Sequence, residues 1–477
     1  MQMRRREFIK GTSLLAGGIA TSFGEAFRDD LEAKLTLDLA RTIAKIPSDF
    51  VGLGYEISSV ARPGLLSAIN SVYVRLCRTL GSSGIIRVGG NTSDYASYSA
   101  SAQPLSSPES GPGSIVNDAV LRDLGSFLES TGWKLIWGLN LGRGTVEAAV
   151  EEAEAVLAAT GSNLLAFEIG NEPDLFPHRE THRKQGYDYE DYLREYRKCR
   201  DALRKSIPGI PFAGPDVAMA TTWVSRFARD EGRDLKVLTH HYYREGQNPT
   251  SSIYKLLHSD PKLGPMLVEL QAASKSCGVP YRFCETNSFS GGGKPGVSDR
   301  FASALWVLDF MYKLAAAQCS GVNMETGVNQ LGFISSYSPI GDDEHGHYVV
   351  LPEFYGMLAF AHGAPGELVD TQLRASFNFE GYAILKPDRQ LCITLINKEP
   401  NLDASVIIEP TLPFQSGSVL RLSAPSLESN SGVTFGGSTV NSDGTWHANR
   451  EEKVQASNGN VRLHLPAASA AVVIMKP

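Results

Sequence analysis

The sequence lacks the features that mark several whole classes of protein. Its six cysteines are scattered over 477 residues without C-x-x-C or Cys/His spacing, so no zinc site or disulfide framework is indicated. Asp and Glu (52) outnumber Lys and Arg (45), and the formal charge of −7 excludes a basic field that would draw the molecule to nucleic acid. The apolar run at residues 13–23 is shorter than the roughly 20 residues that span a bilayer.

The first 26 residues have the composition of an export signal. Arg5 and Arg6 precede the mild apolar run, and a charged segment before a short apolar segment is typical of a secretory leader. The paired arginines favour the twin-arginine route to the periplasm or the medium. The alternative interpretation is a frayed basic tail. We predict an exported protein that has no membrane contact once residues 1–26 are removed.

Strand-like apolar runs alternate with helical patterns between residues 47 and 347. Amphipathic helices are indicated at residues 146–159, 187–207 and 301–317. Eight such units predict a catalytic (β/α)8 TIM barrel. An open doubly wound sheet is the alternative, but no Gly-rich phosphate fingerprint follows the first strand. The predicted strands are residues 50–57, 85–90, 134–142, 164–172, 211–217, 236–243, 281–287 and 321–327.

From residue 348 to residue 477 the pattern changes to short strands separated by Pro, Gly, Asn and Ser turns. Such a pattern predicts a C-terminal antiparallel β-sandwich. Residues 27–46 are rich in strand formers, and we predict that they form an N-terminal strand of the same sandwich. The predicted sandwich strands after residue 348 are 383–386, 390–397, 404–409, 418–422, 444–447 and 461–475.

The first candidate catalytic residue is Glu172, at the end of the fourth predicted strand. The apolar run that begins at Leu164 ends in Asn171-Glu172-Pro173, and Pro173 stops regular strand pairing. A carboxylate at the C-terminal end of a barrel strand is more readily catalytic than structural.

A second carboxylate, Glu285, lies at the end of the seventh predicted strand, just before the Gly-rich segment at residues 288–293. Glycoside hydrolysis needs two carboxyl groups that flank one glycosidic bond. Glu172 and Glu285 therefore form a candidate glycosidase pair. The alternative interpretation of Glu285 is a strand-end residue in a salt bridge.

Three motifs together resemble glycoside hydrolase family 79. They are residues 167–173 (FEIGNEP), residues 240–243 (HHYY), and residues 285–288 (ETNS) followed by three glycines at 291–293. The family contains β-glucuronidases and heparanases, and belongs to clan A of the retaining (β/α)8 glycosidases. The likeness covers residues 50–340, and the trailing β-sandwich suits it.

The resemblance implies roles for the central residues. Glu172 matches the acid/base and Glu285 the nucleophile. Asn171 matches the asparagine that binds the sugar 2-hydroxyl. Tyr242 matches the tyrosine that hydrogen-bonds the nucleophile, and His240 shares its strand parity.

The resemblance also implies sugar ligands around the pair. Glu56 and Asn91 match residues that bind sugar hydroxyls on strands one and two. Gly291 and Gly292 match backbone amides that receive the glucuronate carboxylate. This chemistry is reasonable because glycines let amide groups approach an anion closely.

The carboxylate site departs from the family at two positions. Ser290 stands where some members have a tyrosine, and Tyr337 matches the tyrosine after strand eight only with a slip of a few residues. A local basic patch also follows the acid/base, either as a solvated loop or to meet an acidic aglycone. The patch consists of His178, Arg179, His182, Arg183 and Lys184.

We therefore predict a retaining exo-β-glucuronidase that acts on a glucuronic acid-containing glycoside or oligosaccharide and needs no metal or organic cofactor. Burial and the charge of Glu285 are expected to raise the pKa of Glu172. The acidic net charge favours exo action over an endo-acting, heparanase-like enzyme that must hold a sulfated polyanion. The same motifs also suit a neutral-sugar glycosidase of the clan, such as an arabinofuranosidase or xylosidase, and the barrel alone suits a non-catalytic carbohydrate-binding protein.

Overall fold

The computed structural model describes residues 31–107, 113–179, 182–330, 335–342, 347–411, 414–457 and 459–476. The predicted export signal at residues 1–26 lies outside this part of the chain. Among the residues described, no helix is both long and apolar enough to cross a membrane.

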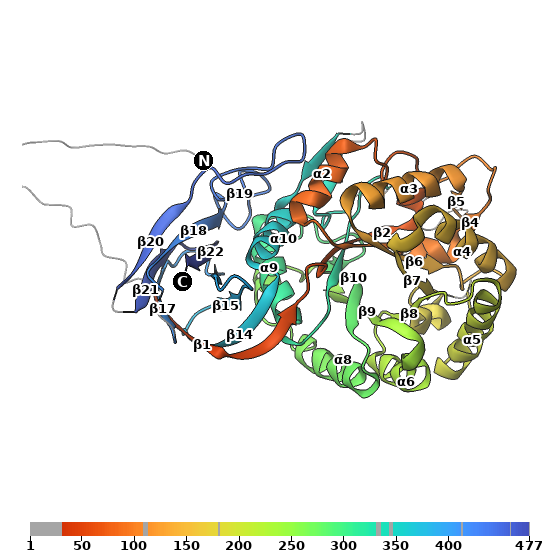
Figure 1. Cartoon of the computed structure of the whole chain (residues 1–477), viewed down its shortest axis with the longest axis horizontal. Helices are drawn as coiled ribbons and strands as arrows, with labels where there is room; N and C mark the ends of the chain where they lie inside the picture. Colours follow the sequence, from red (N-terminus) through yellow and green to blue (C-terminus); the bar gives the residue numbers. More distant parts are fainter. Residues whose placement is uncertain are drawn as a thin grey trace, which may run out of the picture.

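Eight parallel strands close into a barrel, as predicted. Helices between the strands cover the outside of the barrel (Figure 1). Because both faces of each strand are buried, the strands are nearly continuous apolar runs in the sequence. In chain order they are β2 (Val51–Glu56), β3 (Ile85–Gly89), β6 (Lys134–Leu139), β7 (Leu164–Ile169), β8 (Phe212–Val217), β9 (Leu235–Gly246), β10 (Tyr281–Ser290) and β11 (Val322–Glu325).

Local sequence sets the helix ends. α5 (Tyr189–Ser206) begins after Asp188, which forms a capping box with Asp191. α3 (Asp118–Thr131) ends at Gly132, which is left-handed as is usual for a helix C-terminus. The other helices described are α1 (Ile57–Ala61), α2 (Ser71–Leu80), α4 (Val146–Thr160), α6 (Thr221–Glu231), α7 (Ile253–Leu257), α8 (Leu263–Cys277), α9 (Phe301–Ala316) and α10 (Pro352–Gly363).

Short elements complete the barrel domain. The 3-10 helices are η1 (Asn91–Tyr95), η2 (Gly161–Asn163), η3 (Pro173–His178) and η4 (Gly232–Asp234). Two small sheets pair β4 (Ser97–Tyr98) with β5 (Ile115–Val116), and β12 (Ile340–Asp342) with β13 (Tyr348–Val350). Of these, η1 and η3 follow barrel strands directly and bring residues to the site.

Small and aliphatic side chains fill the interior of the barrel. They form a separate buried cluster of Ile85, Ile136, Ala166, Ala213, Val237 and Cys284. Side chains alternate along a strand, so the inward position of Val237 on β9 gives the same direction to Thr239, His241 and Tyr243. Polar side chains lie beyond this cluster, at the C-terminal ends of the strands, where active sites of such barrels are built.

The second domain is one ten-stranded sheet around its own apolar core. The strand order is β19-β18-β20-β21-β17-β1-β14-β15-β16-β22, and β18 also pairs with β22, so the sheet closes on itself. The strands are β1 (Leu31–Ile46), β14 (Gly366–Arg374), β15 (Phe379–Leu385), β16 (Leu391–Asn397), β17 (Ala404–Pro410), β18 (Ser416–Ser423), β19 (Thr434–Phe435), β20 (Glu452–Ser457), β21 (Asn460–Leu465) and β22 (Ser469–Lys476).

Two details differ from the antiparallel sandwich predicted. β1 pairs parallel with β17 and antiparallel with β14. Because the whole barrel separates β1 from the other strands in sequence, no hairpin dictates its direction. The strand predicted at residues 444–447 is wrong: this segment is a loop whose Trp446 ring stacks on Phe435 at 5.1 Å between centroids.

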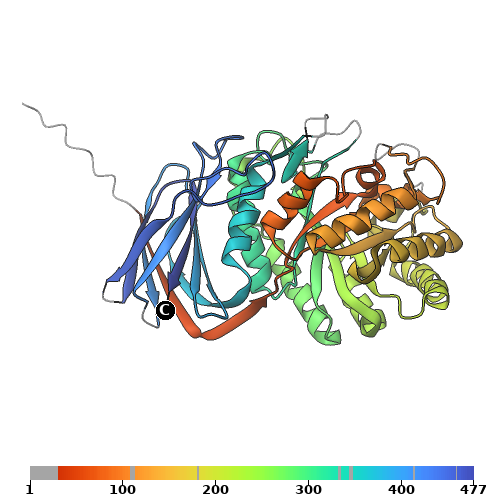
Figure 2. The same cartoon turned by 45° about the horizontal axis from the view of Figure 1, so that its top comes forward.

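The two domains meet along α9 and α10, and β1 runs from the sheet towards the barrel (Figures 1 and 2). Asp309 on α9 accepts hydrogen bonds from the Tyr382 hydroxyl (2.6 Å) and from Lys398 Nζ (2.9 Å), both from the sandwich. Lys313 bridges Asp309 (2.8 Å) and Glu380 (3.1 Å). A buried ionic cluster therefore joins the domains.

Candidate active site

A pocket of about 470 Å³ opens at the C-terminal ends of the barrel strands. This volume is ordinary for a small-molecule site. Most of the predicted site residues line it, namely Glu56, Asn91, Glu172, Tyr242, Glu285, Ser290, Gly291, Gly292 and Tyr337. Asn171 and His240 are buried instead and do not line it.

Glu172 reaches the pocket through a turn rather than through strand alternation. β7 ends at Ile169, three residues before the predicted end, and Gly170 (φ 86°) then turns the chain. Glu172 has φ 50°, a left-handed conformation that is uncommon and strained for a non-glycine residue. Pro173 follows as the first residue of η3, where its missing N–H is not needed. Such strain is often found at functional sites.

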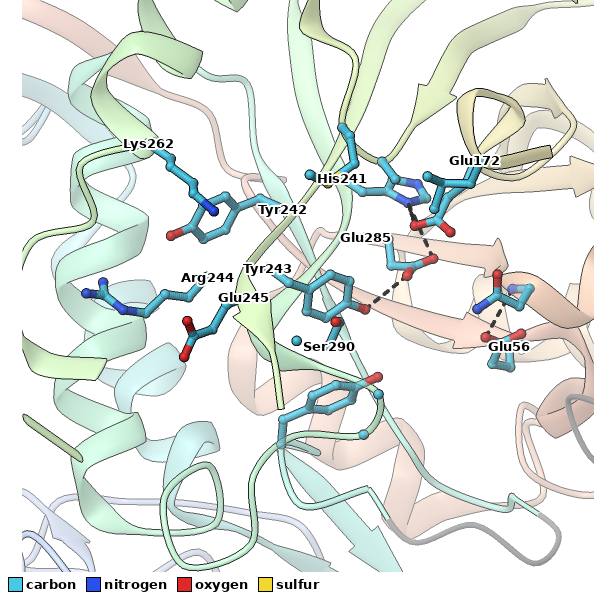
Figure 3. A pocket seen from close by; sticks show the side chains of 18 of the residues that line it. Glu56, Glu172, His241, Tyr242, Tyr243, Arg244, Glu245, Lys262, Glu285 and Ser290 are labelled. Carbon is cyan, nitrogen blue, oxygen red and sulfur yellow. Dashed lines mark hydrogen bonds and ion pairs between the residues drawn. The ribbon is translucent and has the colours of Figure 1, made fainter. Parts of the chain in front are cut away.

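Glu172, His241 and Glu285 converge in the pocket (Figure 3). One side-chain ligand atom from each lies within 4.8 Å of the other two. His241 Nδ1 lies 3.2 Å from Glu172 Oε1 and 3.7 Å from Glu285 Oε2. The Tyr243 hydroxyl donates to Glu285 Oε1 at 2.9 Å. Two carboxylates are thus held close together by fixed polar partners.

The role predicted for Tyr242 is wrong. Its side chain shares the outward parity of β9, and its hydroxyl donates to Asp260 (2.8 Å) while its ring stacks on Phe310 at 5.1 Å. Tyr243, the next residue, points inward and makes the bond to Glu285. Tyr242 contributes only to the pocket wall.

His240 faces away from the site for the same reason. Its ring packs edge-on to Phe283 at 5.9 Å, and burial lowers its pKa to about 3. His241 lies among the carboxylates, with Nε2 at 2.7 Å from Asp216 Oδ1. Of the two adjacent histidines, the sequence interpretation therefore assigns the wrong one to the site. His241, and not His240, shares the inward parity of Val237.

Arg87 organises the floor of the site. Its fully buried guanidinium donates to Glu285 Oε2 at 2.9 Å, to Asp216 Oδ2 at 2.6 Å and to Glu168 Oε2 at 3.2 Å. It also donates to Asn171 Oδ1 at 2.8 Å. A charged, multiply bonded partner holds a carboxylate in its ionised form and in one orientation. Glu285 is therefore held in one orientation in the pocket.

The charges of this network set the protonation of its members. Burial acts to lower the pKa of His241, but Asp216 and Glu285 outweigh it and raise the pKa well above the usual range. Burial raises the pKa of Glu168 to about 7, with Asp216 adding to the effect and Arg87 opposing it. His241 is thus an imidazolium at neutral pH, with carboxylates at both ring nitrogens.

The pKa of Glu172 runs opposite to the expectation from the sequence. Burial acts to raise it, but the hydrogen bonds and charges of His241 and Arg179 outweigh burial, and the pKa is lowered. Arg179 Nη2 donates to Glu172 Oε2 at 2.6 Å. The sequence indicated Arg179 as part of a basic patch but did not predict this ion pair, because it could not place the patch relative to the carboxylate.

The end of the pocket beside η1 holds the predicted hydroxyl ligands. The Glu56 carboxylate accepts from the backbone amides of Asn91 (3.1 Å) and Thr92 (2.8 Å) and from the Thr92 hydroxyl (2.6 Å). Asn171 Nδ2 lies 3.5 Å from Asn91 Oδ1. Glu56, Asn91 and Asn171 are therefore adjacent, although they come from three different strand ends.

The glycine turn after β10 forms another wall. Gly291, Gly292 and Gly293 have φ of 76°, 84° and 82°, which side chains rarely allow. The Ser336 amide donates to the Gly292 carbonyl at 2.5 Å, which ties the turn to the segment that carries Tyr337. The Tyr337 ring stacks on Tyr243 at 6.0 Å. Tyr337 is thus brought beside the glycines despite the uncertain sequence match.

Several residues of the site were missed from the sequence. Arg87 and Asp216 carry a signal that could have been used, since each is a polar residue near the end of an apolar barrel strand. Glu325, which ends β11, is another; burial, Glu285 and Glu56 raise its pKa well above the usual range. Among described residues the site's carboxylates already contact Arg87 and Arg179, whose charges disfavour a metal ion between Glu172, His241 and Glu285.

Comparison with known proteins gives consistent results. Residues 381–472 match the glycosyl hydrolase family 79 C-terminal beta domain. A β-glucuronidase of Aspergillus niger is 26% identical over 385 residues, or 73% of this chain and 69% of that protein. A β-glucuronidase of Neurospora crassa is 27% identical over 63% of this chain and 59% of its own length.

A solved structure shares the fold of nearly the whole chain. It is a 4-O-α-L-rhamnosyl-β-D-glucuronidase from Fusarium oxysporum in complex with Rha-GlcA, with a TM-score of 0.76 and 18% identity over 92% of this chain and 99% of that one. The family match and the two β-glucuronidase relatives show that the chain is a glycoside hydrolase. The resemblance to glycoside hydrolase family 79 is confirmed, and the chain carries the C-terminal β domain of that family.

Proposed function

We propose that this chain is a retaining exo-β-glucuronidase. The observation that carries the proposal is the pair Glu172 and Glu285, in which an oxygen of each lies within 4.8 Å of an oxygen of the other. Glu172 lies in the turn after β7, the fourth barrel strand, and Glu285 lies on β10, the seventh. Retaining glycosidases hold their carboxyl groups about 5–5.5 Å apart, whereas inverting enzymes leave about 6.5–9.5 Å for a water. The β-glucuronidase relatives support a glucuronide as substrate.

In the proposed mechanism Glu285 attacks the anomeric carbon while Glu172 protonates the glycosidic oxygen. Arg87 and Tyr243 donate hydrogen bonds to Glu285 and orient it for attack. Water then hydrolyses the glycosyl-enzyme, and Glu172 accepts the proton that this water loses. Asn171, the predicted ligand of the sugar 2-hydroxyl, is held by Arg87 beside Asn91 and lies buried behind the pocket lining.

The glucuronate carboxylate is assigned to the Ser290–Gly292 turn and Tyr337. A carboxylate that leaves water needs fixed donors in exchange. Backbone amides on a glycine turn supply donors without adding a titrating group. Glu56 and Asn91 then bind hydroxyls at the other side of the ring. This assignment supports a glucuronide over a neutral sugar.

Exo action and export complete the proposal. A pocket of about 470 Å³ suits a terminal sugar and part of its aglycone, and a net charge of −7 is unsuited to a long sulfated polyanion.

We also propose that Arg5 and Arg6 direct export by the twin-arginine route. Replacing both by lysine should leave the protein in the producing cell, and continued export would contradict this route.

The test combines substrates and variants. The wild type should cleave aryl β-glucuronide faster than the matching β-glucoside or α-L-arabinofuranoside and release the β-anomer first, as read by NMR before mutarotation. Glu285→Gln should abolish turnover. Glu172→Ala should slow poor leaving groups by about 10²–10⁴-fold and spare activated aryl glucuronides. A preference for glucoside, or an α-anomer as first product, would overturn the glucuronidase or the retaining assignment respectively.

A further inference from the structure

Arg179 has an unusual relation to the proposed acid/base residue. It directly follows η3, lines the pocket and donates to Glu172 Oε2 at 2.6 Å. Within the described part of the chain this is the only hydrogen bond of its guanidinium, and the buried Nη1 has no partner. Among the residues described, Arg179 therefore has a buried donor without a partner while its other terminal nitrogen occupies the carboxylate that must carry the proton.

The ion pair opposes the chemistry proposed for Glu172. A general acid must be protonated when the substrate is bound, but a neighbouring cation favours the charged carboxylate. Despite burial, His241 and Arg179 lower the pKa of Glu172. His241 is anchored at its other nitrogen by Asp216 (2.7 Å), whereas no residue in the described part of the chain anchors the guanidinium of Arg179 in this way. Other charged groups facing Glu172 or Arg179 are Asp94 on η1, Asp174 on η3 and Glu285 on β10.

Arg179 lies on the leaving-group side of the proposed site. A general acid stands beside the leaving oxygen, so a residue that holds its carboxylate lies on the leaving-group side. Arg244 and Lys262 also line the pocket, across Glu285 from Glu56 (Figure 3). Arg244 donates to the Ser259 carbonyl at 3.2 Å, and Lys262 forms no ion pair among the residues described. The pocket therefore has cationic donors on two sides, with Arg179 beside Glu172 and with Arg244 and Lys262 on the side opposite Glu172 (Figure 3).

We propose that Arg179 is a specificity residue for the leaving group, which holds Glu172 in the empty site and transfers to a carboxylate or sulfate on the aglycone. The inference rests on the proposed acid/base role of Glu172. Once the guanidinium has moved, Glu172 takes up a proton from solvent. It passes this proton to the glycosidic oxygen as the C1–O bond breaks and the bond from Glu285 to C1 forms. Acidic aglycones are thereby cleaved preferentially.

The test uses aryl β-glucuronides whose phenols are matched in acidity and carry no charge, a carboxylate or a sulfate. The wild type should show a kcat/KM about tenfold higher for the anionic members, and salt should reduce this difference. Arg179→Gln should remove the preference, and Arg179→Lys should restore part of it. Lys184→Gln is the matched control, because Lys184 is an exposed cation of the same segment outside the pocket.

The pH profile provides a second readout. For a neutral substrate, Arg179→Gln should move the basic limb of kcat/KM up by about one pH unit, because the carboxylate loses a cation. An unchanged preference and profile would overturn the inference. So would a loss of glucuronide-over-glucoside selectivity, which would place Arg179 on the sugar carboxylate.

If Arg179→Gln does not fold, the pH profiles of the wild type with anionic and neutral aglycones test the inference. The basic limb of kcat should then lie at higher pH for anionic than for neutral aglycones, and coincident limbs would overturn the inference. Failure of the underlying function has a different signature, because Glu172→Ala would then slow all leaving groups equally.

Discussion

At the scale of single residues, the proposed nucleophile depends on partners that are remote in sequence. Glu285 receives hydrogen bonds from Arg87 on β3 and from Tyr243 on β9. Both donors stabilise the anion, so each helps to keep Glu285 nucleophilic. The contact with Tyr243 is the simplest to remove without disturbing the charge balance of the site.

Tyr243→Phe should lower kcat/KM about 10- to 100-fold, since a hydrogen bond to a charged group contributes about 1.5–3 kcal/mol. The measurement is steady-state hydrolysis of an activated aryl glucuronide. Tyr242→Phe is the control, because the Tyr242 hydroxyl donates to Asp260 instead of Glu285. This variant should lower kcat/KM by well under tenfold. A larger effect in Tyr242→Phe than in Tyr243→Phe would contradict the orientation of β9.

At the scale of elements, the glycine turn after β10 and the packing of α4 on the barrel show how local structure serves the site and the fold. The turn needs three successive positive φ angles. On α4, Glu152 is buried and accepts a hydrogen bond from Trp137 Nε1 on β6 at 2.8 Å. The turn therefore requires glycine for its backbone conformation, whereas the surroundings of α4 disfavour the charged form of Glu152.

Gly292→Val should depress glucuronide hydrolysis and reduce the selectivity for glucuronide over glucoside by tenfold or more. This is the effect expected from the loss of about two hydrogen-bond donors to the glucuronate carboxylate. The side chain strains the backbone at φ 84° and narrows the pocket. Gly209→Val is the matched control: it has φ 80° and no atom near a new Cβ, so it shares the strain but lies outside the pocket. Equal selectivity in both variants would argue against the carboxylate assignment.

Glu152→Gln should stabilise the protein at high pH but not at low pH. Burial raises the pKa of Glu152 to about 7, so the folded state binds the proton more tightly than the unfolded state. The contribution of protonated Glu152 to the free energy of unfolding is therefore fully present below about pH 4.5, and it is lost as the pH rises to about 7. Above pH 7 the free energy of unfolding of Glu152→Gln should exceed that of the wild type by about 3 kcal/mol. Thermal unfolding at pH 4.5 and 8 tests this, with the exposed Glu151→Gln expected to show no such change.

At the scale of the whole molecule, the two domains are integrated rather than merely linked. β1 precedes the barrel in sequence but lies between β17 and β14 in the middle of the second sheet. The cluster around Asp309 adds a polar contact between α9 and the sandwich. Burial acts to raise the pKa of Asp309, but Lys398 and Lys313 outweigh it and lower the pKa to about 2.

Asp309→Leu should destabilise the molecule by about 3 kcal/mol, because it leaves Lys398 buried without its nearest carboxylate. Calorimetry should show a lower Tm, and separate transitions if the domains uncouple. Lys313→Met should cost much less, because the Lys313 side chain is 32% exposed whereas that of Lys398 is 3% exposed. Equal Tm values for Asp309→Leu and the wild type would mean that the cluster does not stabilise the interface.

The sequence by itself determined the eight-stranded barrel and singled out Glu172 and Glu285, because apolar periodicity and carboxylates that follow apolar runs are local patterns. It also indicated the glycine turn, since consecutive glycines mark a backbone that side chains would block. Only the tertiary structure decided that Tyr243 and His241, rather than Tyr242 and His240, face the site. That choice depends on how β9 packs between its neighbours, and one residue of register exchanges the two faces. The lowered pKa of Glu172 likewise arises from Arg179 and His241, whose charges reach the carboxylate only once the barrel has closed and excluded water.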